Sequence, residues 1–138
     1  MDIDAIGSTV DELNYDIEAV IGPEEKKSRI GYIVDAIKNI EGGAKKARLL
    51  DDLTPKLVVV TLQKAGTPIF LNALDVDESG NVKIEYIKEI IDEFSEIIED
   101  YCIGIRSGIF SNEEEIKSEF NENVTSVNRA LDRVKEWV

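Results

Sequence analysis

Histidine is absent from this 138-residue sequence, and its absence excludes several kinds of catalysis and metal binding. Without an imidazole the chain has no Ser-His-Asp triad and no Cys-His pair, because both rely on histidine as the general base. Histidine-ligated zinc and Glu-x-x-His di-iron motifs are excluded for the same reason. An enzyme built on this sequence would have to use carboxylates, lysine, arginine or tyrosine, around a bound metal.

Cysteine is nearly absent too, since Cys102 is the only one. A single cysteine cannot form an internal disulfide or a thiolate zinc cluster. No histidine exists to activate its thiol, so we interpret Cys102 as a small buried hydrophobic residue following Tyr101.

Basic residues are few, with 16 Lys and Arg against 29 Asp and Glu, which gives a formal net charge of -13. This charge disfavours partners held through phosphate contacts, so we expect neither nucleic acid nor an anionic membrane surface. No apolar run approaches the roughly 18 residues of a membrane span. The opening residues, MDIDAIGSTVDE, are acidic where a signal peptide is basic. We therefore predict a cytoplasmic protein.

The length and the 43% hydrophobic content suit a single domain of residues 1–138. Apolar residues recur at three- and four-residue intervals, which predicts amphipathic helices. Gly22 and Pro23 separate the first two, because glycine favours a helix end and proline a helix start. Five helices are expected, at about residues 9–20, 23–41, 44–53, 84–101 and 112–138.

Strands are expected in the middle of the chain. LVVVTLQ at 57–63 is dense in β-branched residues, KAGTP at 64–68 has turn residues, and IFLNALDV at 69–76 resumes the apolar run. VKI at 82–84 offers a short third strand. The predicted class is α+β, predominantly helical, with a two- to three-stranded antiparallel meander near residues 57–86. CIGIRSGIF at 102–110 is ambiguous and permits an edge strand.

DVDESGNVKIEY at 75–86 resembles the first half of an EF-hand calcium loop. An EF-hand takes ligands from positions 1, 3, 5, 7, 9 and 12, needs glycine at 6 and depends on a bidentate glutamate at 12. Position 9 here is Lys83 and position 12 is Tyr86, so the second half fails. The stretch therefore has two possible roles. One is weak Ca²⁺ binding, and the other is a structural turn made of residue types that tolerate tight backbone geometry. The candidate metal ligands are Asp75, Asp77, Ser79 and Asn81.

A second alternative is a Mg²⁺-dependent carboxylate enzyme acting on nucleotides. All-helical nucleotide pyrophosphohydrolases use E-x-x-E followed downstream by E-x-x-D, and Glu93 with Glu96 matches the first half. The only E-x-x-D, Glu89 to Asp92, comes before that pair, so the order differs from this family.

The last predicted helix has an apolar seam at four- and three-residue spacing that ends near a tryptophan. Such seams are chiefly core in a small domain, but tryptophan is also the most frequent interface anchor. The leading hypothesis is a non-catalytic interaction or assembly module that associates through amphipathic helices, as a homodimer or with a protein partner. The candidate interaction residues are Phe120, Val124, Val127, Leu131, Val134 and Trp137.

Overall fold

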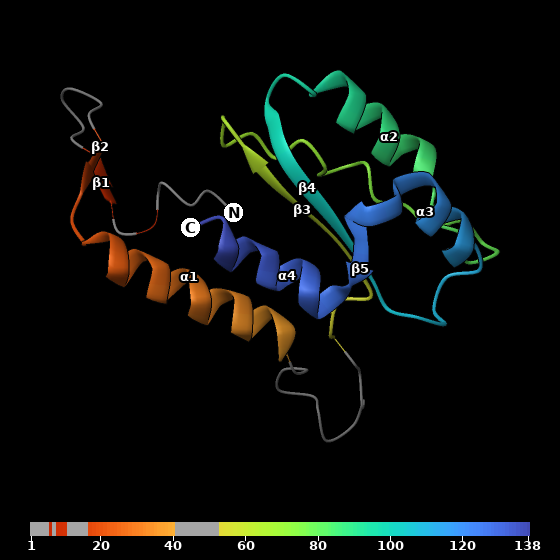
Figure 1. The fold of residues 1–138 in the computed structure, drawn as a ribbon, viewed down its shortest axis with the longest axis horizontal. Coiled ribbons are helices and arrows are strands. Elements are labelled where there is room, and N and C mark those ends of the chain that lie inside the picture. The colour runs from red at the N-terminus through yellow and green to blue at the C-terminus, as the bar shows by residue number, and fades with distance from the viewer. Residues whose placement is uncertain (1–5, 7, 11–16, 41–52) are drawn as a thin grey trace.

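The computed structural model describes residues 6, 8–10, 17–40 and 53–138. Its fold is α+β, as the sequence predicts (Figure 1). Among these residues, no helix combines the length and apolar character needed to cross a bilayer. The elements in chain order are β1 (Ser8–Val10), β2 (Ile17–Ala19), α1 (Pro23–Lys38), β3 (Leu57–Gln63), α2 (Ile84–Glu93), β4 (Ile98–Ile105), α3 (Glu113–Phe120), the 3₁₀ turn η1 (Asn121–Asn123), β5 (Val124–Ser126) and α4 (Val127–Glu136).

The main sheet has the order β3-β4-β5 and is mixed. β3 and β4 pair antiparallel, with Leu57 opposite Ile105 and Val60 opposite Cys102. β5 pairs with β4 in parallel, with Ile103 opposite Val124, and α3 provides the crossover that parallel neighbours need. β1 and β2 form a separate antiparallel pair.

The predicted meander at 57–86 is wrong in its second strand. Residues 69–73 form consecutive turns, with the amide of Leu71 donating to Pro68 O at 3.3 Å and that of Ala73 to Phe70 O at 3.2 Å. The expected third strand is reduced to one isolated bridge, Val76 to Val82. β3 takes β4 as its partner instead, with Ile103 and Ile105 of β4 buried on one face of the sheet and Gly104 against α4 on the other.

The helix expected over 84–101 is correct only as far as Glu93. Phe94 leaves the helical region with φ -102° and ψ 18°, and the chain re-enters the sheet at Ile98. The three- and four-residue spacing of Phe94, Ile98 and Tyr101 is compatible with a helix, but sheet pairing overrides it. The ambiguous stretch 102–110 begins as the centre of the sheet and not as its edge.

The single helix expected over 112–138 is broken into α3 and α4. Asn121 adopts φ +47° and ψ -119°, which lies outside the helical region, and ends α3. The β-branched pair Val124 and Thr125 then joins the sheet. Ser126 starts α4 as its N-cap, its hydroxyl accepting from the Arg129 amide at 3.4 Å.

The remaining helix predictions have mixed outcomes. α1 confirms the helix after Gly22 and Pro23. The first expected helix is wrong, because Ser8–Val10 and Ile17–Ala19 form a strand pair that suits the β-branched Thr9, Val10 and Ile17. The helix expected at 44–53 lies almost wholly outside the described residues. The described chain thus has four α-helices where five were expected in all.

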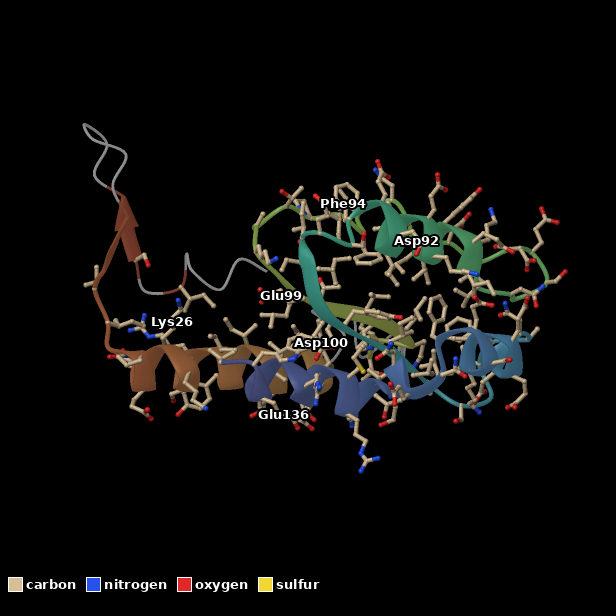
Figure 2. All side chains as sticks on the ribbon, turned by 45° about the horizontal axis from the view of Figure 1, so that its top comes forward. Lys26, Asp92, Phe94, Glu99, Asp100 and Glu136 are labelled. Carbon is tan, nitrogen blue, oxygen red and sulfur yellow. The ribbon has the colours of Figure 1, made fainter. Side chains whose placement is uncertain are left out.

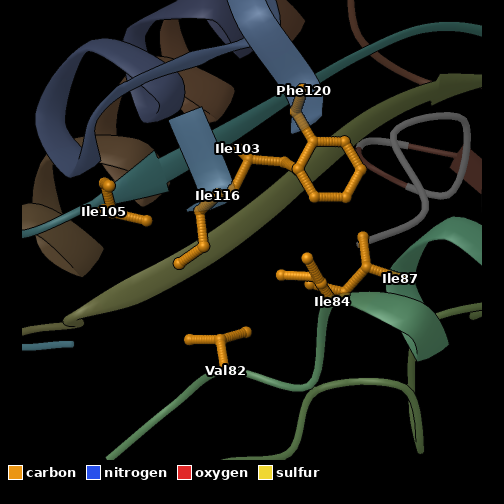
Figure 3. Close-up of a cluster of buried hydrophobic side chains, with 7 residues drawn as sticks. All are labelled: Val82, Ile84, Ile87, Ile103, Ile105, Ile116 and Phe120. Carbon is orange, nitrogen blue, oxygen red and sulfur yellow. The ribbon is translucent and has the colours of Figure 1, made fainter. Parts of the chain in front are cut away.

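Helices cover both faces of the sheet (Figure 1). On one face, α2 and α3 bury a cluster against β4, shown in Figure 3. On the other face, α1 and α4 bury a second cluster against Val58 and Val60 of β3. The first cluster consists of Val82, Ile84, Ile87, Ile103, Ile105, Ile116 and Phe120, and the second of Ile30, Val34, Val127 and Leu131.

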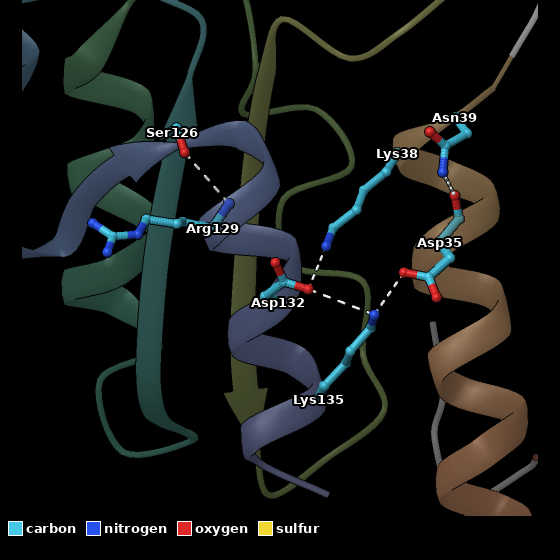
Figure 4. A network of polar contacts seen from close by, with 7 residues as sticks. All are labelled: Asp35, Lys38, Asn39, Ser126, Arg129, Asp132 and Lys135. Carbon is cyan, nitrogen blue, oxygen red and sulfur yellow. Dashed lines mark hydrogen bonds and ion pairs between the residues drawn. The ribbon is translucent and has the colours of Figure 1, made fainter.

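Polar contacts hold α1 against α4 (Figure 4). Asp132 of α4 pairs with Lys38 of α1, and Lys135 reaches the Asp35 carboxylate of α1 at 2.6 Å. Lys135 also lies 3.5 Å from Asp132, so the four charges alternate in sign across the helix pair. The pKa of Asp132 is lowered, chiefly by its hydrogen bond from Lys38.

Asp100 ties the end of α4 to the sheet. Its Oδ2 accepts from Arg133 at 3.1 Å and from the Trp137 indole Nε1 at 3.0 Å. Partial burial of this carboxylate raises its pKa, but the hydrogen bonds from Arg133 and Trp137 outweigh that effect, so the pKa is lowered overall. The Trp137 indole is therefore anchored within the chain.

Candidate functional site

The EF-hand-like loop closes around Asp77. The Asp77 Oδ1 accepts from the amides of Ser79 and Asn81, both at 2.9 Å, and Oδ2 accepts from the Asn81 side chain at 2.9 Å. These bonds lower the pKa of Asp77, the Asn81 side chain contributing most. Gly80 sits at φ +82°, as a tight turn requires. The Asp77 carboxylate thus caps its own loop, an arrangement typical of a structural turn.

Asp75, the first candidate metal ligand, pairs with Lys83 at 2.5 Å. The Lys83 ammonium comes from position 9 of the loop, where an EF-hand contributes to the calcium shell. The hydrogen bond from Lys83 is the largest cause that lowers the pKa of Asp75. The carboxylates of Asp75 and Asp77 are therefore engaged by groups of the same loop.

The loop is fastened to the start of α3 by two neighbouring side chains. The Asn112 Oδ1 accepts from the Val82 amide and its Nδ2 donates to the Val82 carbonyl, both at 2.9 Å. Ser111 Oγ donates to Ser79 O at 2.8 Å. Asn112 thereby imitates a strand neighbour for Val82, which is a buried member of the first core cluster.

Replacing Asn112 with alanine is expected to lower the free energy of unfolding by about 1–3 kcal/mol, because both backbone groups of buried Val82 lose their partner. Urea unfolding monitored by circular dichroism measures this. Asn128→Ala on exposed α4 surface is the matched control, with a change within about 0.5 kcal/mol expected. Equal stabilities of the two variants would show that Asn112 does not fasten the loop.

The carboxylates singled out for Mg²⁺ do not converge. Glu93 is the last residue of α2 and Glu96 lies in the turn after it, so no helix sets their spacing. Within 17–40, 53–138 and the few described residues before them, no group of three or more Asp, Glu or Cys side chains could hold a metal ion. In this part of the chain the carboxylates considered for Mg²⁺ therefore do not gather into a ligand set, and the Ca²⁺ ligands predicted at 75–81 stay a prediction.

The C-terminal seam lies largely inside the molecule. Phe120, Val127 and Leu131 are each 5% exposed. Val124 and Val134 are half-buried against the two clusters, and Trp137 is half-buried with its indole bonded to Asp100. The six candidate interaction residues thus pack mainly against α1, α2 and the sheet of their own chain.

Cys102 is half-buried in β4. Burial raises the pKa of its thiol, which keeps the thiol protonated and weakly nucleophilic near neutral pH. This agrees with the interpretation of Cys102 as a packing residue.

A different surface, which exposes large apolar side chains among polar ones, is open to solvent. A groove of about 560 Å³ lies between α2 and the turns at 68–73. Leu71 on its turn side is 78% exposed and Tyr86 on its helix side is 44% exposed. Ile90 and Phe94 continue the apolar lining along the helix, and Figure 2 places Phe94 at the end of α2. We call this feature the α2 groove, with the lining Pro68, Ile69, Leu71, Asn72, Ala73, Tyr86, Glu89, Ile90, Glu93 and Phe94.

The helix wall of the α2 groove is acidic. Tyr86, Glu89, Ile90 and Glu93 fall at i, i+3, i+4 and i+7, so they form one stripe of α2 that faces the groove. Glu89 and Glu93 are exposed and make no ion pair with any described residue, whereas Lys88 on the neighbouring stripe pairs with Glu119. Figure 2 shows oxygen-tipped side chains projecting from α2 away from the sheet and labels Asp92 on this helix.

Another hollow, of about 580 Å³, lies at the start of α4, and its walls are mixed polar and apolar. Its Lys117 pairs with Glu113 at 2.8 Å and with Glu114 at 3.0 Å, and its Ser126 hydroxyl caps α4. The Lys117 ammonium and the Ser126 hydroxyl are thus engaged within the chain.

Sequence reasoning did not find the α2 groove. The apolar run at 69–76 predicts a strand, in which Leu71 would alternate toward a core, whereas the nearby turn residues Pro68 and Asn72 indicate an exposed turn. No family model, curated protein or solved structure matches this chain significantly. The geometry of its own residues is therefore the basis for a functional assignment.

Proposed function

We propose that this protein is a small acidic interaction module that binds a protein partner and does not catalyse a reaction. The observation that carries the proposal is the α2 groove, where Leu71 leaves 78% of its surface in water beside an exposed Tyr86. Adjoining exposed apolar side chains in a concave site are typical of protein-binding surfaces, and tyrosine is frequent among binding hot spots. A cytoplasmic location stays a prediction from the sequence.

The partner can be another protein or a second copy of this chain. Self-association has to overcome the repulsion between two chains of formal charge -13, so we favour a different protein. The homodimer expected from the sequence remains a testable alternative, whose interface would have to use surface other than the buried seam residues.

Selection from an unbiased displayed peptide library tests the proposal without assuming the partner's chemistry. We expect peptides enriched on the wild-type protein to lose binding by about tenfold or more on Leu71→Asp. That substitution places a charge in the groove at a highly exposed position, so the fold should tolerate it. Ile109→Asp is the matched control, since Ile109 is 47% exposed and does not line the groove.

Light-scattering mass provides the second measurement. If the mass exceeds 15.4 kDa, rises with protein concentration and returns to the monomer value in Leu71→Asp, a second copy of the chain occupies the α2 groove. A monomer that enriches no Leu71-dependent peptide would overturn the proposal.

A further inference from the structure

The α2 groove has a polarity that narrows the class of its partner, if the proposed binding function is correct. Its apolar lining includes Leu71 on the turn side and Ile90 and Phe94 along α2, and Glu89 and Glu93 lie on the same helix. A ligand that covered Leu71 and Tyr86 would lie directly beside these two carboxylates. An acidic ligand would repel the two carboxylates. A purely apolar ligand would partly dehydrate them without supplying a partner.

The spacing of the two carboxylates also indicates the shape of the ligand. Glu89 and Glu93 are one helical turn apart on α2, a rise of about 6 Å. Lysine or arginine residues at i and i+4 of a partner helix have the same separation. α2 has 10 residues and is about 15 Å long, so the groove can hold two to three turns of such a helix.

We propose that the α2 groove binds a short, basic, amphipathic helix from another protein. Its apolar stripe contacts Leu71 and Tyr86, and lysine or arginine side chains one turn apart pair with Glu89 and Glu93. Complementary charge carries this assignment, because the two glutamates have no cation among the described residues and the whole chain is strongly acidic. Helix-in-groove recognition uses this combination of apolar anchors and flanking charges.

The test uses the full chain and two synthetic peptides of about 14 residues. Both carry the same leucine stripe, but one has lysine at paired positions one turn apart and the other has glutamate there. Dissociation constants are measured by fluorescence anisotropy at 50 mM and 300 mM salt. The lysine peptide is expected to bind about tenfold more tightly than the glutamate peptide at low salt, and to lose most of this advantage at high salt.

Matched charge variants separate the groove from the general acidity of the protein. Glu89→Gln with Glu93→Gln is expected to weaken the lysine peptide about fivefold, since two exposed ion pairs are lost. Glu24→Gln with Glu122→Gln removes the same charge from α1 and η1, and a change below about twofold is expected. Equal losses in the two double variants would overturn the inference.

The two proposals fail in different ways. If the glutamate peptide binds as well as the lysine peptide and both lose binding on Leu71→Asp, the groove binds proteins but the basic partner is wrong. If neither peptide binds and the displayed library yields nothing that depends on Leu71, both proposals are overturned.

Discussion

Gly104→Ala is expected to lower the free energy of unfolding by about 2–3 kcal/mol, a large effect for one added methyl group. Gly104 lies in the central strand β4, directly beneath α4. A Cβ atom there would come within 2.7 Å of Val58 Cγ2, 2.8 Å of the Ala130 Cβ and 2.8 Å of the Val127 Cα. The contact with the Val127 backbone cannot be relieved by rotating a side chain, so α4 has to move away from the sheet.

Gly31→Ala is the matched control for this substitution. Gly31 lies inside α1, and a Cβ atom there would meet nothing within 4 Å. Alanine is the better helix former, so this variant is expected to gain about 0.5–1 kcal/mol. Urea unfolding of both variants measures the difference. A Gly104→Ala protein as stable as the wild type would mean that α4 does not pack on β4 as described.

Phe120→Ala is expected to cost about 3–5 kcal/mol, the range for removing a large aromatic side chain from a well-packed core. Phe120 is 5% exposed and packs with Ile103 of β4 and Ile116 of α3 (Figure 3). The same residue was an interaction candidate on sequence grounds. A core role requires lost stability, whereas an interface role requires lost association in a stable monomer.

Leu71→Ala provides the comparison for Phe120. Both residues are large and apolar in the sequence, yet Leu71 is 78% exposed, so its truncation is expected to change stability by no more than about 0.5 kcal/mol. Thermal unfolding measures the stability of both variants, and light scattering at several protein concentrations measures their association. If Phe120→Ala keeps wild-type stability and abolishes a concentration-dependent mass, the seam is an interface and the core assignment is wrong.

Local signals were sufficient to predict some elements. Gly22 and Pro23 mark the start of α1, and the β-branched run at 57–63 predicts β3. Both elements follow from terminal geometry and intrinsic preference, which act within a few residues.

Other elements depend on contacts between distant residues. The spacing of Phe94, Ile98 and Tyr101 fits a helix, and only the pairing of β4 with β3, more than 30 residues earlier, decides for a strand. The apolar residues of the C-terminal seam keep helical spacing on both sides of Asn121, although the φ of +47° at Asn121 separates α3 from α4. Ser126 was the missed local signal, because an N-cap residue inside a long apolar pattern marks a new helix start.

The candidate sites were harder to predict for the same reason. The sequence identifies the loop at 75–86 and its departure from the EF-hand pattern at Lys83. In the structure this same lysine forms the ion pair with Asp75. The α2 groove, however, exists because the turns at 68–73 lie alongside α2, whose residues are some 20 positions away in the chain. Exposure of Leu71 cannot be read from its apolar character alone.

The C-terminal seam is core in the structure, and we propose that the α2 groove is the binding face. Titration of ¹⁵N-labelled protein with the lysine peptide, followed by amide chemical shifts, tests it most directly. Saturable shifts are expected at residues 69–73 and 86–94, with only small changes at Phe120, Val127 and Leu131. Shifts centred on those three residues, or no saturable shifts at all, would contradict it.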